Sequence, residues 1–241
     1  MPVEEQHIAS VFDRDLEAIQ ARILKMGGLV ETAILEAAQS LETRDEELAE
    51  KVRQGDKVID ELEEMINEDT ARLIALRAPT ASDLRIVLTV MKISSNLERI
   101  GDYAKNMAKR TSILAQMSPI NGSQAALRRM AREVNEMLKD ALDAFIQRDA
   151  AMAQAVIDRD ADVDQMYNAL FREFLTFMME DPRNITACMH LHFMAKNTER
   201  MGDHVTSICE QVIYLVTGDT PDEPRQKGDR TSTDASIAPQ M

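Results

Sequence analysis

The chain of 241 residues carries 42 acidic and 28 basic side chains, a formal net charge of −14, and only 4% of its residues are aromatic. Nucleic-acid binding needs a basic face or stripe, and the sequence shows none, so direct contact with nucleic acid is not expected. Eight glycines and seven prolines are too few turn-forming residues for a strand-rich domain, and the composition therefore favours helices.

The sequence predicts a cytoplasmic protein. Its first ten residues, MPVEEQHIAS, are polar and acidic, unlike a secretory signal. No window approaches the ~20 apolar residues that a membrane helix needs, so we expect membrane contact only through a partner. Cys188 and Cys209 fall on one predicted helix, roughly 31 Å apart, and cannot pair within it, which fits a reducing compartment.

Helical periodicity predicts three long helices in each half of the chain. They cover about residues 5–41, 45–76 and 81–117 in the first half, and about residues 124–148, 150–180 and 183–216 in the second. Gly27 and Gly28 interrupt the first helix and predict a kink. Pro79 and Pro182 each end a helix and open a hairpin turn. Helices longer than ~25 residues indicate bundle packing, so the predicted fold class is all-α, a tandem pair of antiparallel three-helix bundles.

The clearest linker follows the third helix, where Pro119, Asn121 and Gly122 lie close together. We therefore expect a first bundle over residues 5–118 and a second over residues 122–217. The remaining residues, 218–241, are polar and proline-containing, and we expect them to form a disordered tail.

The two halves repeat each other. NLERIGD at residues 96–102 matches NTERMGD at residues 197–203, and DKVID at residues 56–60 matches DADVD at residues 160–164. The two hairpin prolines match at nearly the same offset. Three landmarks in one order indicate a tandem repeat of one three-helix unit.

The repeated segments carry four pairs of carboxylates spaced i, i+4, which places both members of a pair on one helix face. The pairs are Asp56 with Asp60, Glu98 with Asp102, Asp160 with Asp164, and Glu199 with Asp203. Within each predicted hairpin, one pair lies about 20 residues before the turn and the other about 20 residues after it. Antiparallel helices therefore bring the two pairs to the same height along the hairpin. Converging carboxylates repel unless they hold cations. Ligands made wholly of oxygen suit Mg²⁺, Mn²⁺, Ca²⁺ or iron and suit structural Zn²⁺ poorly.

Any single pair of this kind is more often a solvated helix face than a ligand set, and the fourfold occurrence favours metal binding. Asp56 and Asp60 flank the apolar stripe of their helix, so we expect the site at the surface. Arg99 and Arg200 lie inside the motifs and are expected to brace neighbouring carboxylates, although a plain surface role is nearly as common. The sequence FMME at residues 177–180 is expected to fill the core, and a partner groove is the alternative.

The sequence resembles the PhoU family at NLERIGD and NTERMGD, and also at RAPTASDLR (residues 77–85) and FMMEDPR (residues 177–183). The resemblance covers roughly residues 5–217. It implies two similar three-helix bundles of spectrin-repeat type, with metal clusters held by the eight carboxylates named above. It also implies a homodimer that represses the phosphate-starvation (Pho) regulon. Its partners would be the transporter ATPase subunit PstB and the sensor histidine kinase PhoR.

No nucleophile–base arrangement or catalytic motif stands out in the sequence, so we expect no enzyme activity. The alternative is a carboxylate-bridged multinuclear metalloenzyme, since two metal ions in an oxygen ligand set can activate water. A purely structural bundle with empty acidic faces also stays open.

Overall fold

The computed structural model describes residues 3–77 and 81–219, and these form six long helices and no strand. The helices are α1 (Val3–Thr43), α2 (Glu46–Arg77), α3 (Ala81–Leu114), α4 (Ser123–Gln147), α5 (Ala150–Glu180) and α6 (Ile185–Thr217). A short 3-10 turn, η1 (Pro182–Asn184), precedes α6. The all-α prediction is confirmed, and the observed helix boundaries lie within a few residues of the predicted ones. Pro79 and the tail beyond residue 219 fall outside the described residues.

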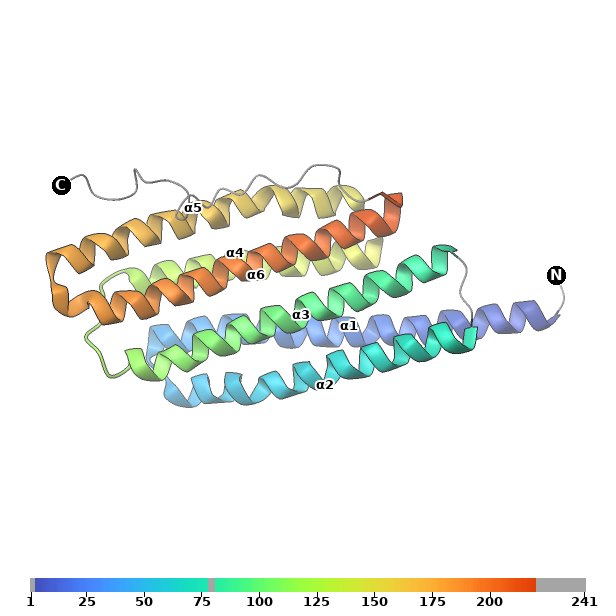
Figure 1. Ribbon diagram of the computed structural model, residues 1–241, viewed down its shortest axis with the longest axis horizontal. Helices are drawn as coiled ribbons and strands as arrows, with labels where there is room; N and C mark the ends of the chain where they lie inside the picture. Colours follow the sequence, from blue (N-terminus) through green and yellow to red (C-terminus); the bar gives the residue numbers. More distant parts are fainter. Residues whose placement is uncertain (1–2, 78–80, 220–241) are drawn as a thin grey trace.

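The helices form two layers (Figure 1). One layer contains α2, α3, α6 and α5 in that order, with α3 and α6 side by side in its middle. The second layer contains α1 and α4, which contact each other, and each also packs on the helices of its own half. Each half therefore contributes one hairpin to the first layer and one helix to the second.

The central helices α3 and α6 run antiparallel. Arg85 near the start of α3 lies over the ring of Tyr214 near the end of α6, and Arg110 near the end of α3 lies over Phe193 near the start of α6. The end of α2 and the start of α3 accordingly lie at the opposite end of the molecule from the α5–α6 turn (Figure 1). The two repeated motifs meet at the centre, where Asn96 of the first contacts His204, directly after the second.

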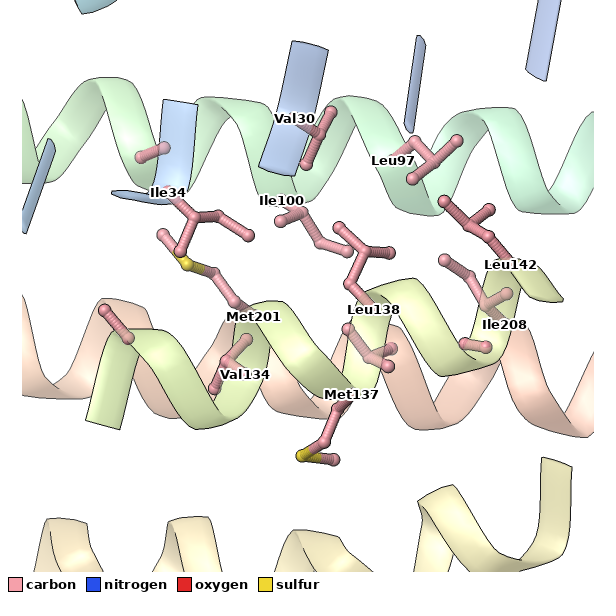
Figure 2. Close-up of a cluster of buried hydrophobic side chains, with 14 of the residues drawn as sticks. Val30, Ile34, Leu97, Ile100, Val134, Met137, Leu138, Leu142, Met201 and Ile208 are labelled. Atoms are coloured by element: carbon pink, nitrogen blue, oxygen red, sulfur yellow. The ribbon is translucent and has the colours of Figure 1, made fainter. Parts of the chain in front are cut away.

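A single hydrophobic core runs through both halves. Figure 2 shows its central part, where Val30 and Ile34 of α1 and Ile100 of α3 face Leu138 of α4 and Met201 of α6. Six methionines are buried in this core, where the flexible thioether adapts to irregular gaps. Each half contributes three helices, but they bury their apolar faces together. The predicted division into two bundles at residues 118 and 122 stays a prediction.

Glycines determine two local features of the helices. The kink expected at Gly27 and Gly28 does not interrupt α1, which is continuous through both residues. A methyl group at Gly27 would clash with the side chain of Leu142 in α4, so this glycine allows α1 and α4 to approach closely. The helix α6 ends, as predicted, at Gly218, whose φ of 86° is the left-handed conformation that commonly terminates helices.

None of the helices in the described part of the chain is both long and apolar enough to cross a membrane. Cys188 and Cys209 both lie on α6 and are unpaired, as the sequence predicted, and both thiols are buried.

Candidate metal centre

The first carboxylate cluster lies where α2 crosses the repeated motif of α3. Asp56 of α2 is only 4% exposed. A methyl group at Gly101 of α3 would lie 3.1 Å from Ile59 Cδ1 and 3.8 Å from Asp56 Oδ1. The glycine in the motif therefore lets α2 approach α3 closely enough for the Asp56 carboxylate to reach the α3 backbone. This distance places Asp56 of α2 beside the repeated motif of α3.

A lysine that the sequence analysis did not single out joins the two helices. Lys105 Nζ of α3 donates a hydrogen bond to Asp56 Oδ2 of α2 and another, 2.8 Å long, to Asp102 Oδ1. Glu98 shares a hydrogen bond with Asp102. Lys105 follows Asp102 by three residues, which is the spacing of a helical ion pair, and this spacing is the signal that could have identified it.

The carboxylates of the first cluster have pKa values that are shifted in different directions. Burial, followed by the hydrogen bond and charge of Asp102, raises the pKa of Glu98 to about 7. Burial also acts to raise the pKa of Asp102, but hydrogen bonds from Lys105 and Glu98 and the Lys105 charge outweigh it and hold that pKa below its usual value. Desolvation and the charge of Asp56 raise the pKa of Asp60. Neighbouring carboxylates thus share their protons unevenly, as expected for like charges at close range.

The second cluster repeats this arrangement between α5 and α6. A methyl group at Gly202 would lie 3.1 Å from Asp160 Oδ1, so the carboxylate again lies against the motif glycine of the neighbouring helix. Asp160, Asp164 and Glu199 are all buried, with exposures of 2 to 3%, whereas Asp203 is half-buried.

The expectation of a surface site is wrong for four of the eight carboxylates. The buried four are Asp56, Asp160, Asp164 and Glu199. Asp60 is exposed, and Glu98, Asp102 and Asp203 are half-buried. The helical wheel placed Asp56 on the flank of its apolar stripe, but glycine on the facing helix brings the two backbones close and encloses that flank.

The two arginines behave differently from each other. Arg99 is 61% exposed, and its guanidinium lies 3.6 Å from Glu98 and 3.9 Å from Asp102, so it braces these carboxylates loosely. Arg200 instead lies over the ring of Tyr103 on α3, 6.0 Å from its centroid. In the second half a lysine again contacts a motif carboxylate, because Lys196 Nζ lies 2.9 Å from Glu199 Oε1.

The donor chemistry of these clusters suits a hard cation, because every ligand atom would be a carboxylate oxygen. Asp56 Oδ1 is buried and accepts no hydrogen bond from the described residues, so it retains an unused ligand atom. In their present positions, no three histidine, cysteine, aspartate or glutamate side chains of the described ranges converge closely enough to hold a metal ion. The donor types suit a hard cation, and the side chains would have to turn to hold one.

A row of arginine–aromatic contacts joins α3 to α6, and we call these six residues the α3–α6 seam. They are Arg85 with Tyr214, Tyr103 with Arg200, and Arg110 with Phe193. The three guanidiniums lie 5.5, 6.0 and 4.5 Å from the respective ring centroids. None of the three forms an ion pair with a carboxylate of the described residues. Near the middle of the seam, His204 Nδ1 lies 2.8 Å from Asn96 Oδ1, so this histidine links α6 to α3.

Comparison with known proteins identifies the chain. The PhoU domain model matches residues 23–111 and again residues 127–212, once in each half. A phosphate-specific transport system accessory protein PhoU homolog of Rhizobium meliloti is 42% identical over 96% of this chain and 98% of the relative, and one of Zymomonas mobilis is 46% identical over 92% and 93%. The crystal structure of PhoU from Pseudomonas aeruginosa aligns with a TM-score of 0.82 and 40% identity, covering 86% of this chain and all of that one. The phosphate transport system regulatory protein PhoU from Streptococcus pneumoniae aligns with a TM-score of 0.81 and 32% identity, covering 88% and 100%.

These names describe accessory and regulatory proteins of phosphate transport rather than enzymes, in agreement with the prediction that the chain is not an enzyme. The two separate matches also agree with the internal repeat read from the sequence. The chain belongs to the PhoU family.

Proposed function

We propose that this chain is a non-enzymatic, metal-binding regulator of inorganic phosphate uptake and a negative regulator of phosphate-starvation signalling. It acts in the cytoplasm as an adaptor between the transporter ATPase subunit PstB and the sensor histidine kinase PhoR, and it forms a homodimer. The accessory-protein names of its relatives favour this role over that of a carboxylate-bridged metalloenzyme.

The observation that carries the adaptor role is the α3–α6 seam. In a chain of net charge −14, most basic side chains would be expected to face acidic ones. The seam guanidiniums instead lie over aromatic rings, and Arg110 Nη1 also lies 3.2 Å from His190 Nδ1. A guanidinium presents a planar fork of donors that matches a carboxylate, so the seam suits an acidic surface of a protein partner.

The size of the seam is that of a protein contact rather than of a small ligand. Arg85 and Arg110 lie 25 residues apart on α3, or about 37 Å along the helix. Exposed apolar side chains accompany the arginines, among them Leu88 of α3 and Phe193 and Met189 of α6. Arginine and aromatic residues together are the types most enriched at the centres of protein interfaces.

A small apolar groove lies between α5 and α6. It has a volume of about 170 Å³ and is lined by Phe171, Phe174, Leu175, Met178, Met189 and His192. Met179 beside it is 65% exposed, so only part of the FMME segment fills the core as expected. The partner-groove alternative for this segment gains support, because methionine adapts its shape to different partners.

The metal part of the proposal assigns the eight carboxylates to two clusters, one in each hairpin. The first contains Asp56, Asp60, Glu98 and Asp102, and the second contains Asp160, Asp164, Glu199 and Asp203. A bound Mg²⁺, Mn²⁺, Ca²⁺ or iron ion would neutralise the repulsion within each cluster and hold the two helices of the hairpin together. In each hairpin a buried aspartate lies beside the motif glycine of the facing helix, Asp56 beside Gly101 and Asp160 beside Gly202.

Binding of purified chain to immobilised PstB and to the cytoplasmic part of PhoR tests the adaptor role. The double variant Arg110→Ala/Arg200→Ala should weaken binding to at least one partner by about tenfold or more, since arginine is enriched among the few interface residues whose truncation costs over about 1 kcal/mol. Arg53→Ala is the matched control, because Arg53 lies on α2 and pairs only with Glu50 among the ion pairs of the described residues. The proposal fails if the natural chain binds neither partner with or without metal, and the seam is not the docking surface if both variants behave alike.

A further inference from the structure

The first cluster already contains a positive charge that belongs to the protein. Lys105 Nζ bonds to one carboxylate from each helix of the hairpin, Asp56 of α2 and Asp102 of α3. We propose that Lys105 is a built-in counter-ion that competes with metal ions for the first cluster and lowers its metal affinity. The inference rests on the proposed function, in which this cluster is a metal site.

The geometry makes lysine and metal alternatives to each other. A metal ion held between α2 and α3 would draw on the same two carboxylates, Asp56 and Asp102, that now accept hydrogen bonds from Lys105. The lysine side chain is mostly buried, with 24% exposure, so its ammonium group cannot turn to water without leaving both partners. Asp56 Oδ1 still lacks a hydrogen-bond partner among the described residues, so the lysine leaves part of the ligand set unused.

The two halves of the repeat differ at this position. Thr206 occupies the place in α6 that Lys105 occupies in α3, and its hydroxyl donates a hydrogen bond to the backbone oxygen of Asp203. The lysine of the second half, Lys196, comes before Glu199 rather than after the motif, and its ammonium also lies 4.9 Å from the centre of the Tyr167 ring. The repeat therefore preserves the carboxylates of both clusters but not the lysine that bridges α2 and α3.

The expected effect follows from charge. A metal entering the first cluster must displace an ammonium group that is hydrogen-bonded to two carboxylates in a partly desolvated site, where such contacts are strong. Removing the charge while keeping hydrogen-bond donors should raise the metal affinity of the cluster by at least about tenfold. The same lysine should hold α2 against α3 in the absence of metal, so its loss should make the hairpin depend on metal for stability.

The test uses full-length chain in which Asp160→Asn/Asp164→Asn disables the second cluster. Titration calorimetry with Mn²⁺ compares this parent with Lys105→Gln, whose neutral amide still donates two hydrogen bonds, and with Lys105→Arg, which keeps the charge. The inference predicts at least tenfold tighter Mn²⁺ binding for Lys105→Gln and no gain for Lys105→Arg. Equal Mn²⁺ affinity in all three would overturn it. If the double-asparagine parent does not fold, the same two lysine variants are compared in the natural chain by counting bound Mn²⁺ per chain.

Thermal unfolding provides a second readout that a purely structural lysine would not produce. In the presence of a chelator, the melting temperature of Lys105→Gln should be lower than that of the parent chain. Adding Mn²⁺ should restore most of this difference in melting temperature. A loss that Mn²⁺ leaves unchanged would contradict competition. If the natural chain binds Mn²⁺ with an affinity that does not depend on residue 105, competition by Lys105 is refuted and metal binding stands. If neither the natural chain nor Lys105→Gln binds Mn²⁺, the metal-binding proposal is refuted as well.

Discussion

Replacing Gly202 with alanine tests the packing of α5 against α6 on which the second carboxylate cluster depends. The added methyl group would lie 3.1 Å from Asp160 Oδ1 and 3.5 Å from Val163 Cγ1 of α5, and 3.9 Å from Val134 Cγ2 of α4. All three neighbours are buried, so none can move away into solvent. Gly55 on α2 is the matched control, because a methyl group there would meet nothing within 4 Å.

Two opposing contributions decide how much each glycine-to-alanine replacement changes the stability of the fold. Alanine in a helix interior is more stable than glycine by about 0.5–1 kcal/mol, and this gain applies to both positions. Overpacking a buried site costs about 1–3 kcal/mol, and this cost applies at Gly202 alone. We therefore expect Gly55→Ala to stabilise the fold by up to about 1 kcal/mol. Gly202→Ala should destabilise it by roughly 1 kcal/mol.

Thermal unfolding followed by circular dichroism measures the difference. For a chain of this size 1 kcal/mol corresponds to about 2–4 °C, so the two variants should melt roughly 4–8 °C apart. Gly101→Ala should fall between them, because its nearest neighbour is the flexible end of the Ile59 side chain. Equal melting temperatures for Gly202→Ala and Gly55→Ala would show that α5 does not lie against the motif of α6 as described.

Three further predictions address other parts of the molecule. Asp149 caps α5 by accepting hydrogen bonds from the backbone N–H groups of Ala151 and Met152, so Asp149→Ala should lower the free energy of unfolding by about 1 kcal/mol in urea titrations. Both thiols are buried and burial raises the pKa of Cys209 to about 12, so Ellman's reagent should label the native chain only after denaturant is added. Because the pKa of Glu98 is raised to about 7 in the folded chain, the native state binds more protons than the unfolded state between about pH 4.5 and 7. Metal-free protein should therefore lose stability as the pH rises through that window, and Glu98→Gln should show a smaller loss.

Much of the architecture could be predicted because its signals are local. Helical periodicity and the prolines at 79 and 182 located all six helices, and the repeated ERxGD motif with equal hairpin arms placed the carboxylate pairs level. Burial was harder to predict, because it depends on which residue faces Asp56 from another helix. A helical wheel carries no information about Gly101, which encloses the flank that the wheel left open.

The contacts between the halves could not be predicted for a similar reason. Nothing in the spacing of α3 and α6 indicates that Arg200 stacks on Tyr103 or that Asn96 meets His204, since these residues lie about a hundred positions apart in the sequence. Lys105 is an intermediate case. Its distance of three residues from Asp102 predicts an ion pair on one helix, but only the packing of α2 shows that it also reaches Asp56.

The most direct test of the account is a crystal structure of the natural chain grown with Mn²⁺, with an anomalous difference map recorded near the manganese edge. We expect a peak between α5 and α6, bounded by the carboxylates of Asp160, Asp164, Glu199 and Asp203, and a weaker or absent peak beside Lys105. A map with no peak at either cluster, in crystals whose solvent contains millimolar Mn²⁺, would contradict the metal-binding claim.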